Sequence, residues 1–164
     1  MELKKILRVP NPTLKKVSEE VLPEDFGKSK QILYDMMHTM YCNNGVGISA
    51  IQIGIPLRLV VMDVSQNGDN PQFFINPKII NRSLEKTVTE EGCLSIPNFF
   101  YDIERPSECR VSYFDIDGNE VEKYFVGIEA TCIQHEIDHL NGVVFIDYLS
   151  RLKRKLAVEK SLKG

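Results

Sequence analysis

The sequence predicts an α+β fold in which antiparallel β-sheets pack around a central helix that carries an H-E-x-x-H motif, with a further helix at the C-terminus. Two observations lead to this prediction. The periodic segments run in the order helix, many strands, helix, short strand and helix, which differs from the alternation of a βαβ repeat. In addition, two alternating runs meet at Asp117-Gly118-Asn119, a sequence typical of the turn between antiparallel strands.

The composition is that of an ordinary globular protein. The chain has 164 residues, of which 43% are apolar and 26% charged, and no repeat or linker divides it. We therefore expect a single domain over residues 1–164. The net charge of −3 argues against a general nucleic-acid binder, and no direct sequence-specific contact with nucleic acid is expected. No apolar run approaches the roughly 20 residues that span a bilayer, so no membrane segment is expected.

The N-terminus and the cysteines indicate a cytoplasmic protein. The opening residues, MELKKILRVPNP, have no long apolar stretch after the lysines and do not resemble a signal peptide. In a reducing compartment, free thiols or a metal site are favoured over two disulfides. The cysteines concerned are Cys42, Cys93, Cys109 and Cys132.

The first helix is predicted over Asp25–Tyr41. Apolar residues, several of them methionines, recur there at helical spacing until Asn43-Asn44-Gly45 ends the pattern. The methionines are expected to fill the core, because a thioether side chain adapts to irregular gaps. His38 lies off the apolar stripe and is expected to be a solvated residue rather than a ligand.

The middle of the chain is predicted to form strands. Residues 57–64 (LRLVVMDV) and 72–80 (QFFINPKII) are rich in β-branched and aromatic side chains, and residues 109–126 form the hairpin already mentioned. A second helix is expected from about Ile128 to Leu140, followed by a short strand over VVFIDYL, residues 143–149. Residues 151–163 are expected to form a terminal helix, with six basic residues and one acidic residue.

The second helix contains the motif His135-Glu136-x-x-His139. Residues four apart lie on one face of a helix, about 6 Å apart along its axis, so two imidazoles can converge on one metal ion. Glu136 is rotated aside, where it can reach a water molecule and act as a general base. The alternative is a surface helix with local ion pairs. An apolar face made by Ile133, Ile137 and Leu140 favours burial, and buried polar side chains then need a partner such as a metal.

A catalytic metal usually has three protein ligands, and the motif supplies only two. Phe145 stands where a longer zinc motif would place a histidine, and Glu159 lies in the basic terminal segment, where nothing else resembles a site. Cys132 shares the helix face, but it precedes His139 by seven positions, which span about 10.5 Å of helix axis and are too far apart for one ion. Cys132 is therefore expected to form a wall of the site. Cys93 remains, and the pattern around it does not distinguish a ligand from an ordinary buried thiol.

Three segments together resemble the bacterial-type peptide deformylases. They are GVGISAIQ at residues 45–52, EGCLS at 91–95 and QHEIDHLNG at 134–142, in the order and at the spacing of that family. The likeness covers nearly the whole chain, so it implies one deformylase catalytic domain over 1–164 with residues 151–164 as its basic C-terminal helix. It implies a metal-dependent amide hydrolase that removes the N-formyl group from the formyl-methionine of newly synthesised polypeptides and releases formate.

The resemblance also implies roles for individual residues. Cys93, His135 and His139 would bind one divalent ion, natively ferrous iron, with zinc, nickel or cobalt as alternatives that the same donors suit. Glu136 would act as general base and then as acid, while the Gln52 side chain and the backbone N–H of Leu94 would stabilise the developing oxyanion.

The remaining implied residues contact the substrate or support the site. They are Gly45, Val46, Gly47, Glu91, Gly92 and Cys132. Backbone at Gly47 would pair with an extended substrate, and the methionine pocket would include Val46, Cys132 and the face of His135. Glu91 would orient a ligand histidine or the nearby loop.

Several points remain expectations. Ser49 replaces the alanine usual at this place in the family, so local packing is expected to differ there. Phe99-Phe100-Tyr101 form either a lip over the cleft or packing between the sheets, and packing is favoured. Arg105 is expected to be structural. The basic terminal helix either contacts the ribosome or is simply a solvated face.

Two rival functions use the same residues. A metallopeptidase would need Glu159 as its third ligand, which the sequence supports poorly. A non-catalytic protein that binds the ribosome or formylated peptides would have no need of Glu136 as a general base or of Gln52.

Overall fold

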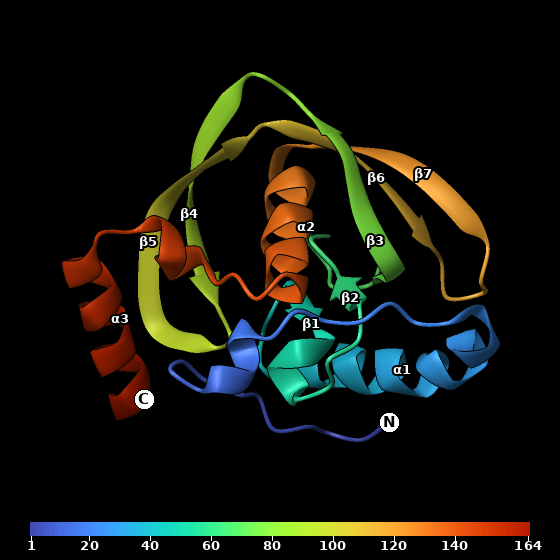
Figure 1. Ribbon diagram of the computed structural model, residues 1–164, viewed down its shortest axis with the longest axis horizontal. Coiled ribbons are helices and arrows are strands. Elements are labelled where there is room, and N and C mark those ends of the chain that lie inside the picture. The colour runs from blue at the N-terminus through green and yellow to red at the C-terminus, as the bar shows by residue number, and fades with distance from the viewer.

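The computed structural model describes residues 1–164 and places two antiparallel sheets around one helix (Figure 1). The larger sheet has the strand order β1 (Gly47–Ser49), β2 (Leu59–Met62), β3 (Gln72–Arg82), β6 (Glu108–Phe114) and β7 (Glu120–Val126). The smaller sheet pairs β4 (Lys86–Cys93) with β5 (Ile96–Pro106). The helices are α1 (Phe26–Cys42), α2 (Gly127–Leu140) and α3 (Arg151–Lys163). The predicted α+β class is confirmed.

The central helix α2 is held by an apolar face. Ile133 is fully buried and Ile137 nearly so, and both belong to the cluster that includes Val60 and Phe74 of the large sheet. Because this face anchors the helix, the rest of α2 is turned towards the small sheet, where its polar residues lie. On the other side of β1 and β2, α1 contributes Met36 and Met40, both fully buried, which confirms their predicted role in the core.

The hairpin between β6 and β7 forms where the sequence predicted it. Gly118 has φ +82°, a conformation that costs glycine little. The carboxylate of Asp115 accepts the backbone N–H groups of Asp117 and Asn119, each at 2.9 Å, and so closes the turn.

The small sheet is irregular at one point. Glu91 pairs with Tyr101, but Cys93 pairs with Ile96, so the single residue Gly92 faces a bulge of four residues on β5. Such a bulge bends a strand and redirects a side chain. Here it places Cys93 at the end of β4, in the hairpin that faces α2.

The strand predicted over residues 143–149 is wrong. This segment contains a short 3-10 helix, η4 (Phe145–Tyr148), whose start is fixed by the Asp147 carboxylate accepting the Val144 N–H at 3.0 Å. Val144, Phe145 and Ile146 are buried in the cluster that joins β5 to α3. A short apolar run is buried in either conformation, which is why its composition did not distinguish them.

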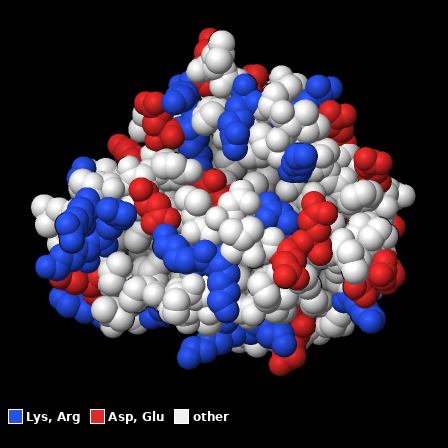
Figure 2. Space-filling model, in the orientation of Figure 1, with Lys and Arg blue, Asp and Glu red and all other residues white.

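The terminal helix α3 forms as predicted and packs against β5. Figure 2 shows Lys and Arg side chains gathered over this helix at the left of the molecule. None of the helices combines the length and the apolar character that a bilayer crossing requires.

Candidate metal centre and active site

Two elements bring three metal-ligating side chains together. Cys93 lies at the end of β4, and His135 and His139 lie one turn apart on α2. Their ligand atoms all lie within 4.8 Å of one another, and Cys93 Sγ is 3.3 Å from His139 Nε2. Ligands 2.0–2.3 Å from a tetrahedral ion lie roughly 3.3–3.8 Å apart, so the three atoms fit such a centre.

The protonation of His139 also suits a metal ligand. The side chain is fully buried, and burial lowers the pKa of its imidazole well below the ordinary value. Its Nδ1 has no hydrogen-bond partner within the protein. A neutral imidazole whose Nε2 faces a thiol is the form that binds a transition metal. One sulfur and two imidazole nitrogens suit several divalent ions, zinc and iron among them.

Glu91 holds the other histidine. Its Oε1 lies 2.9 Å from His135 Nδ1, which leaves Nε2 of that ring free for the centre. Burial alone would raise the pKa of Glu91, but hydrogen bonds from His135 and Arg105 leave it below the ordinary value. Glu91 is therefore a carboxylate that accepts a hydrogen bond from the N–H at Nδ1 of His135. This bond fixes the imidazole in one tautomer.

Glu136 lies beside the centre, with Oε2 3.9 Å from His135 Nε2. Burial raises the pKa of this carboxyl group above its ordinary value, in the direction that a general base working near neutral pH requires. Ser49, the departure from the family pattern, is fully buried, and its hydroxyl lies 2.8 Å from the Glu136 backbone oxygen and 3.0 Å from Oε1. The extra hydroxyl is thus accommodated by hydrogen bonds to Glu136.

Gln52 lies in the 3-10 helix η3 (Ala50–Ile53). The Ser49 N–H donates to Gln52 Oε1 at 2.9 Å, so the amide NH₂ group points the other way, towards the centre. That NH₂ group donates to Ser95 Oγ at 3.0 Å and lies 3.5 Å from Cys93 Sγ. Leu94 occupies the two-residue link between β4 and β5, next to Cys93.

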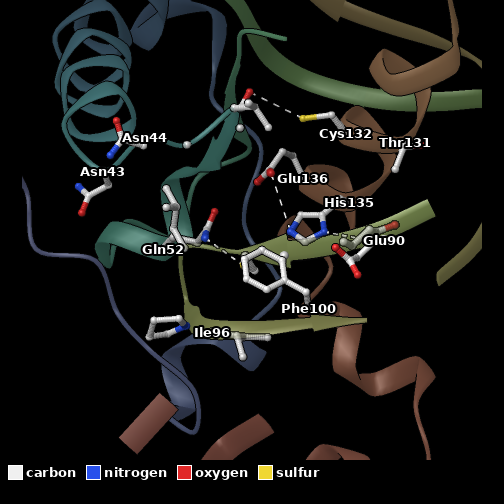
Figure 3. A pocket seen from close by; sticks show the side chains of 18 of the residues that line it. Asn43, Asn44, Gln52, Glu90, Ile96, Phe100, Thr131, Cys132, His135 and Glu136 are labelled. Atoms are coloured by element: carbon white, nitrogen blue, oxygen red, sulfur yellow. Dashed lines mark hydrogen bonds and ion pairs between the residues drawn. The ribbon is translucent and has the colours of Figure 1, made fainter. Parts of the chain in front are cut away.

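The site opens into a cleft of about 510 Å³ (Figure 3). The residues for which a substrate contact was predicted all line it, namely Gly45, Val46, Gly47, Glu91, Gly92 and Cys132. At Gly47 a Cβ atom would lie 2.6 Å from Glu136 Oε2 and 2.8 Å from Cys132 Sγ, so any larger residue would require one of these groups or β1 to shift. Burial raises the pKa of the Cys132 thiol well above its ordinary value, which makes it a neutral wall residue.

The three consecutive aromatic residues of β5, Phe99, Phe100 and Tyr101, divide into two groups. Phe99 is buried and stacks on Tyr101 and Phe145, so packing is the correct interpretation for that side of β5. Phe100 is 62% exposed and lines the cleft (Figure 3), so packing is wrong for this residue. Alternate residues of a strand point to opposite faces, which explains the division.

The cleft also contains residues that the sequence did not indicate. Arg8 and Ile128 both line it. Arg8 reaches the cleft because the N-terminal segment is bonded to the link between β4 and β5. The Val9 N–H donates to Ser95 O there at 2.9 Å. No local motif predicts such a long-range contact.

The other metal-ligand candidates lie elsewhere. Glu159 is exposed on α3, outside the group formed by Cys93 and the two histidines. His38 is partly exposed on α1, and its nearest polar partner is Cys42 at 3.8 Å. All four cysteines are free thiols, as predicted.

A buried H-E-x-x-H helix, a thiol on a neighbouring strand within reach of both histidines and an open cleft are the features of metal-dependent hydrolases. Residues 3–155 match the sequence profile of the family described as Polypeptide deformylase. The chain is 47% identical over 166 residues to a peptide deformylase of Hyphomonas neptunium, covering 100% of this chain and 94% of that protein. It is 47% identical over 163 residues to a peptide deformylase of Pelagibacter ubique, covering 98% of this chain and 94% of that protein.

Solved structures of peptide deformylases have the same fold as this chain. The crystal structure of peptide deformylase from Ehrlichia chaffeensis superposes with a TM-score of 0.94 at 41% identity, covering 99% of this chain and 96% of that chain. The structure of the same enzyme in complex with actinonin superposes with a TM-score of 0.94 at 43% identity, covering 99% of this chain and 98% of that chain. The chain belongs to the polypeptide deformylase family. These metal-dependent hydrolases remove the N-formyl group from newly synthesised polypeptides.

Proposed function

We propose that this chain, acting as one catalytic domain, hydrolyses formyl-methionyl peptides at a single divalent ion held by Cys93, His135 and His139. The observation that carries the proposal is the convergence of these ligand atoms within 4.8 Å, beside the buried carboxyl group of Glu136. We propose ferrous iron as the native ion, with zinc, nickel and cobalt as ions that the donors also suit. When bound, such an ion polarises a carbonyl and lowers the pKa of water.

The chain's own residues then divide the remaining work. Glu136 takes a proton from the attacking water as its oxygen bonds to the formyl carbon. The same carboxyl group returns that proton to the leaving nitrogen as the carbon–nitrogen bond breaks, which gives formate and a free amine. A carboxyl group whose pKa is raised by burial is suited to both transfers. Gln52 Nε2 and the Leu94 N–H donate to the oxygen on which negative charge develops.

The substrate lies in the cleft beside β1. This strand is at the edge of its sheet and pairs only with β2, so its other edge can bond the backbone of an extended peptide near Gly47. The apolar walls at Val46, Cys132 and Ile128 suit the methionine side chain. Gly45 and Gly92 let the Leu94 side chain and the Phe100 ring pack against their backbone, where a Cβ atom would collide with them. Glu91 orients His135.

A ligand substitution tests the centre directly. We expect Cys93→Ala to retain far less than one ion per chain and to release no formate from a formyl-Met-Ala-Ser peptide, because two imidazoles alone hold a divalent ion weakly. Metal analysis and formate release measure both effects. Glu159→Ala is the control and should match the parent. Full metal and activity in Cys93→Ala would overturn the ligand set, and metal loss in Glu159→Ala would favour the metallopeptidase.

We further propose that the protein acts in the cytoplasm and meets nascent chains at the ribosome through α3. Five of the six basic residues of this helix are exposed, and the helix has one acidic residue. Lys153 is the exception, because its Nζ lies 4.2 Å above the Tyr101 ring. A cationic helix on a protein of net charge −3 suits an anionic surface such as that of the ribosome.

Charge reversal tests the ribosome contact. Arg151, Arg154 and Lys155, all replaced by glutamate, should weaken co-sedimentation with ribosomes and reduce its dependence on salt. The matched control reverses three exposed lysines outside α3, namely Lys5, Lys28 and Lys78. Equal sedimentation of the two triple variants would remove α3 as the contact.

A further inference from the structure

A line of polar side chains continues outward from Glu91, beyond the residues that form the centre. The Arg105 guanidinium donates from Nε and Nη2 to the two Glu91 oxygens, at 2.6 and 3.0 Å. Its remaining nitrogen, Nη1, donates to Asp138 Oδ2 at 2.9 Å. The Tyr148 hydroxyl donates to that same Asp138 oxygen at 2.7 Å. The contacts therefore connect His135 to η4, the turn that precedes α3.

These four residues come from four different elements. Glu91 is on β4, Arg105 on β5, Asp138 on α2 and Tyr148 on η4. Arg105 and Glu91 are each 5% exposed, whereas Tyr148 is 56% exposed and is the outermost member. The Arg105 guanidinium carbon lies 5.4 Å from the centre of the Tyr148 ring. A buried cation fixed on one side by a two-pronged ion pair and on the other by a carboxylate has little freedom to rotate.

We propose that Asp138 and Tyr148 are positioning residues of the metal centre, which act on His135 through Arg105 and Glu91. The inference rests on the proposed function, because it takes His135 as a ligand. The imidazole keeps its Nε2 on the centre only while Glu91 holds Nδ1. Glu91 holds that position only while the Arg105 fork prevents its carboxylate from turning. Asp138 fixes the fork from the opposite side, and the Tyr148 hydroxyl and ring fix Asp138 and Arg105 in turn.

A purely structural role makes a different prediction. The same contacts also join η4 to α2, and losing them would lower the melting temperature in either case. A structural role predicts no change in metal retention far below that temperature. It also predicts that the effects of Tyr148 and Glu91 simply add, since the two residues would then act independently.

The test compares Asp138→Asn and Tyr148→Phe, which keep the shape of each side chain and remove one charge or one hydroxyl. Tyr124→Phe is the control, since Tyr124 is exposed to a similar degree, 58%, on β7. Each protein is loaded with zinc, and the rate of zinc loss to a chelating dye is followed at 25 °C. We expect loss to be about tenfold faster for Asp138→Asn and about threefold faster for Tyr148→Phe, within and just below the usual range for residues that support metal ligands.

The kinetic constants and a second background complete the test. In both variants kcat for deformylation should fall while KM stays within about twofold, because the substrate does not touch these residues. In a Glu91→Gln background, Tyr148→Phe should not accelerate zinc loss further. Parental zinc retention in both single variants, or full acceleration by Tyr148→Phe in the Glu91→Gln background, would overturn the proposal. Failure of the deformylase function itself would be seen separately, as no formate release by the zinc-loaded parent.

Discussion

At the scale of single residues, the site depends on how closely Gly47 approaches Glu136. Gly47→Ala would place a methyl group 2.6 Å from Glu136 Oε2, so either the carboxylate or β1 must shift. We expect kcat/KM to fall at least tenfold, because displacement of a catalytic group by a fraction of an ångström has effects of this size. The control is Gly27→Ala, since Gly27 lies exposed in α1 with no atom within 4 Å of the added carbon. Parental kinetics in Gly47→Ala would show that the cleft is looser than described.

The sequence identified some residues of the site and not others, for a physical reason. His135, Glu136 and His139 could be predicted because helix geometry fixes the positions of residues four apart. Cys93 and Gln52 required the family motifs, because their distance from α2 depends on the tertiary fold. The pairing of Arg105 with Asp138 follows from where β5 crosses α2, and no local pattern contains that information.

At the scale of elements, the loop after β2 is held by one carboxylate. Asp63 accepts the backbone N–H groups of Ser65 at 2.9 Å and Asn70 at 3.1 Å, together with the Tyr41 hydroxyl. Its own N–H donates to Val46 O at 2.8 Å, which ties the loop to the cleft wall. Burial alone would raise the pKa of Asp63, but the hydrogen bonds from Ser65 and Tyr41 leave it below the ordinary value.

This depressed pKa predicts how Asp63→Asn should behave. The ionised carboxylate stabilises the fold above the unfolded pKa of about 3.9, and that stabilisation is lost as pH falls through the lower folded pKa. At pH 7 we expect Asp63→Asn to lower the free energy of unfolding by about 1–3 kcal/mol, with the difference shrinking below about pH 4. Chemical denaturation across pH measures this, with the exposed Asp102→Asn as control. If the difference in unfolding free energy between the parent and Asp63→Asn stayed constant down to pH 3, the stabilising role of the ionised Asp63 carboxylate would be contradicted.

Elements with a clear period were predicted well, and those without one were not. α1, α2 and α3 follow their helical spacing, and the β6–β7 hairpin follows its turn residues. η4 was predicted as a strand, because three consecutive buried apolar residues have no period to read. β4 and β5 were not predicted as strands, and the bulge opposite Gly92 could not be predicted, because that irregularity exists only once the two strands lie side by side.

At the scale of the whole molecule, the two sheets meet at α2, and the reactive groups lie along that contact. The large sheet anchors the apolar face of the helix, and the small sheet supplies Cys93, Glu91 and Arg105 to its polar face. The order of elements was sufficient to predict the α+β class. It could not predict which face of α2 each sheet would cover, because that depends on packing between segments far apart in the chain.

The central claim is that this arrangement hydrolyses formamides, with Glu136 transferring the proton. The most direct measurement is formate release from formyl-Met-Ala-Ser by protein purified without oxygen, beside Glu136→Gln and an acetyl-Met-Ala-Ser control. We expect rapid release by the parent, a loss of at least 100-fold in the variant with its metal retained, and no acetate from the control. No formate from a folded, fully metallated parent, or parental release by Glu136→Gln, would contradict the account.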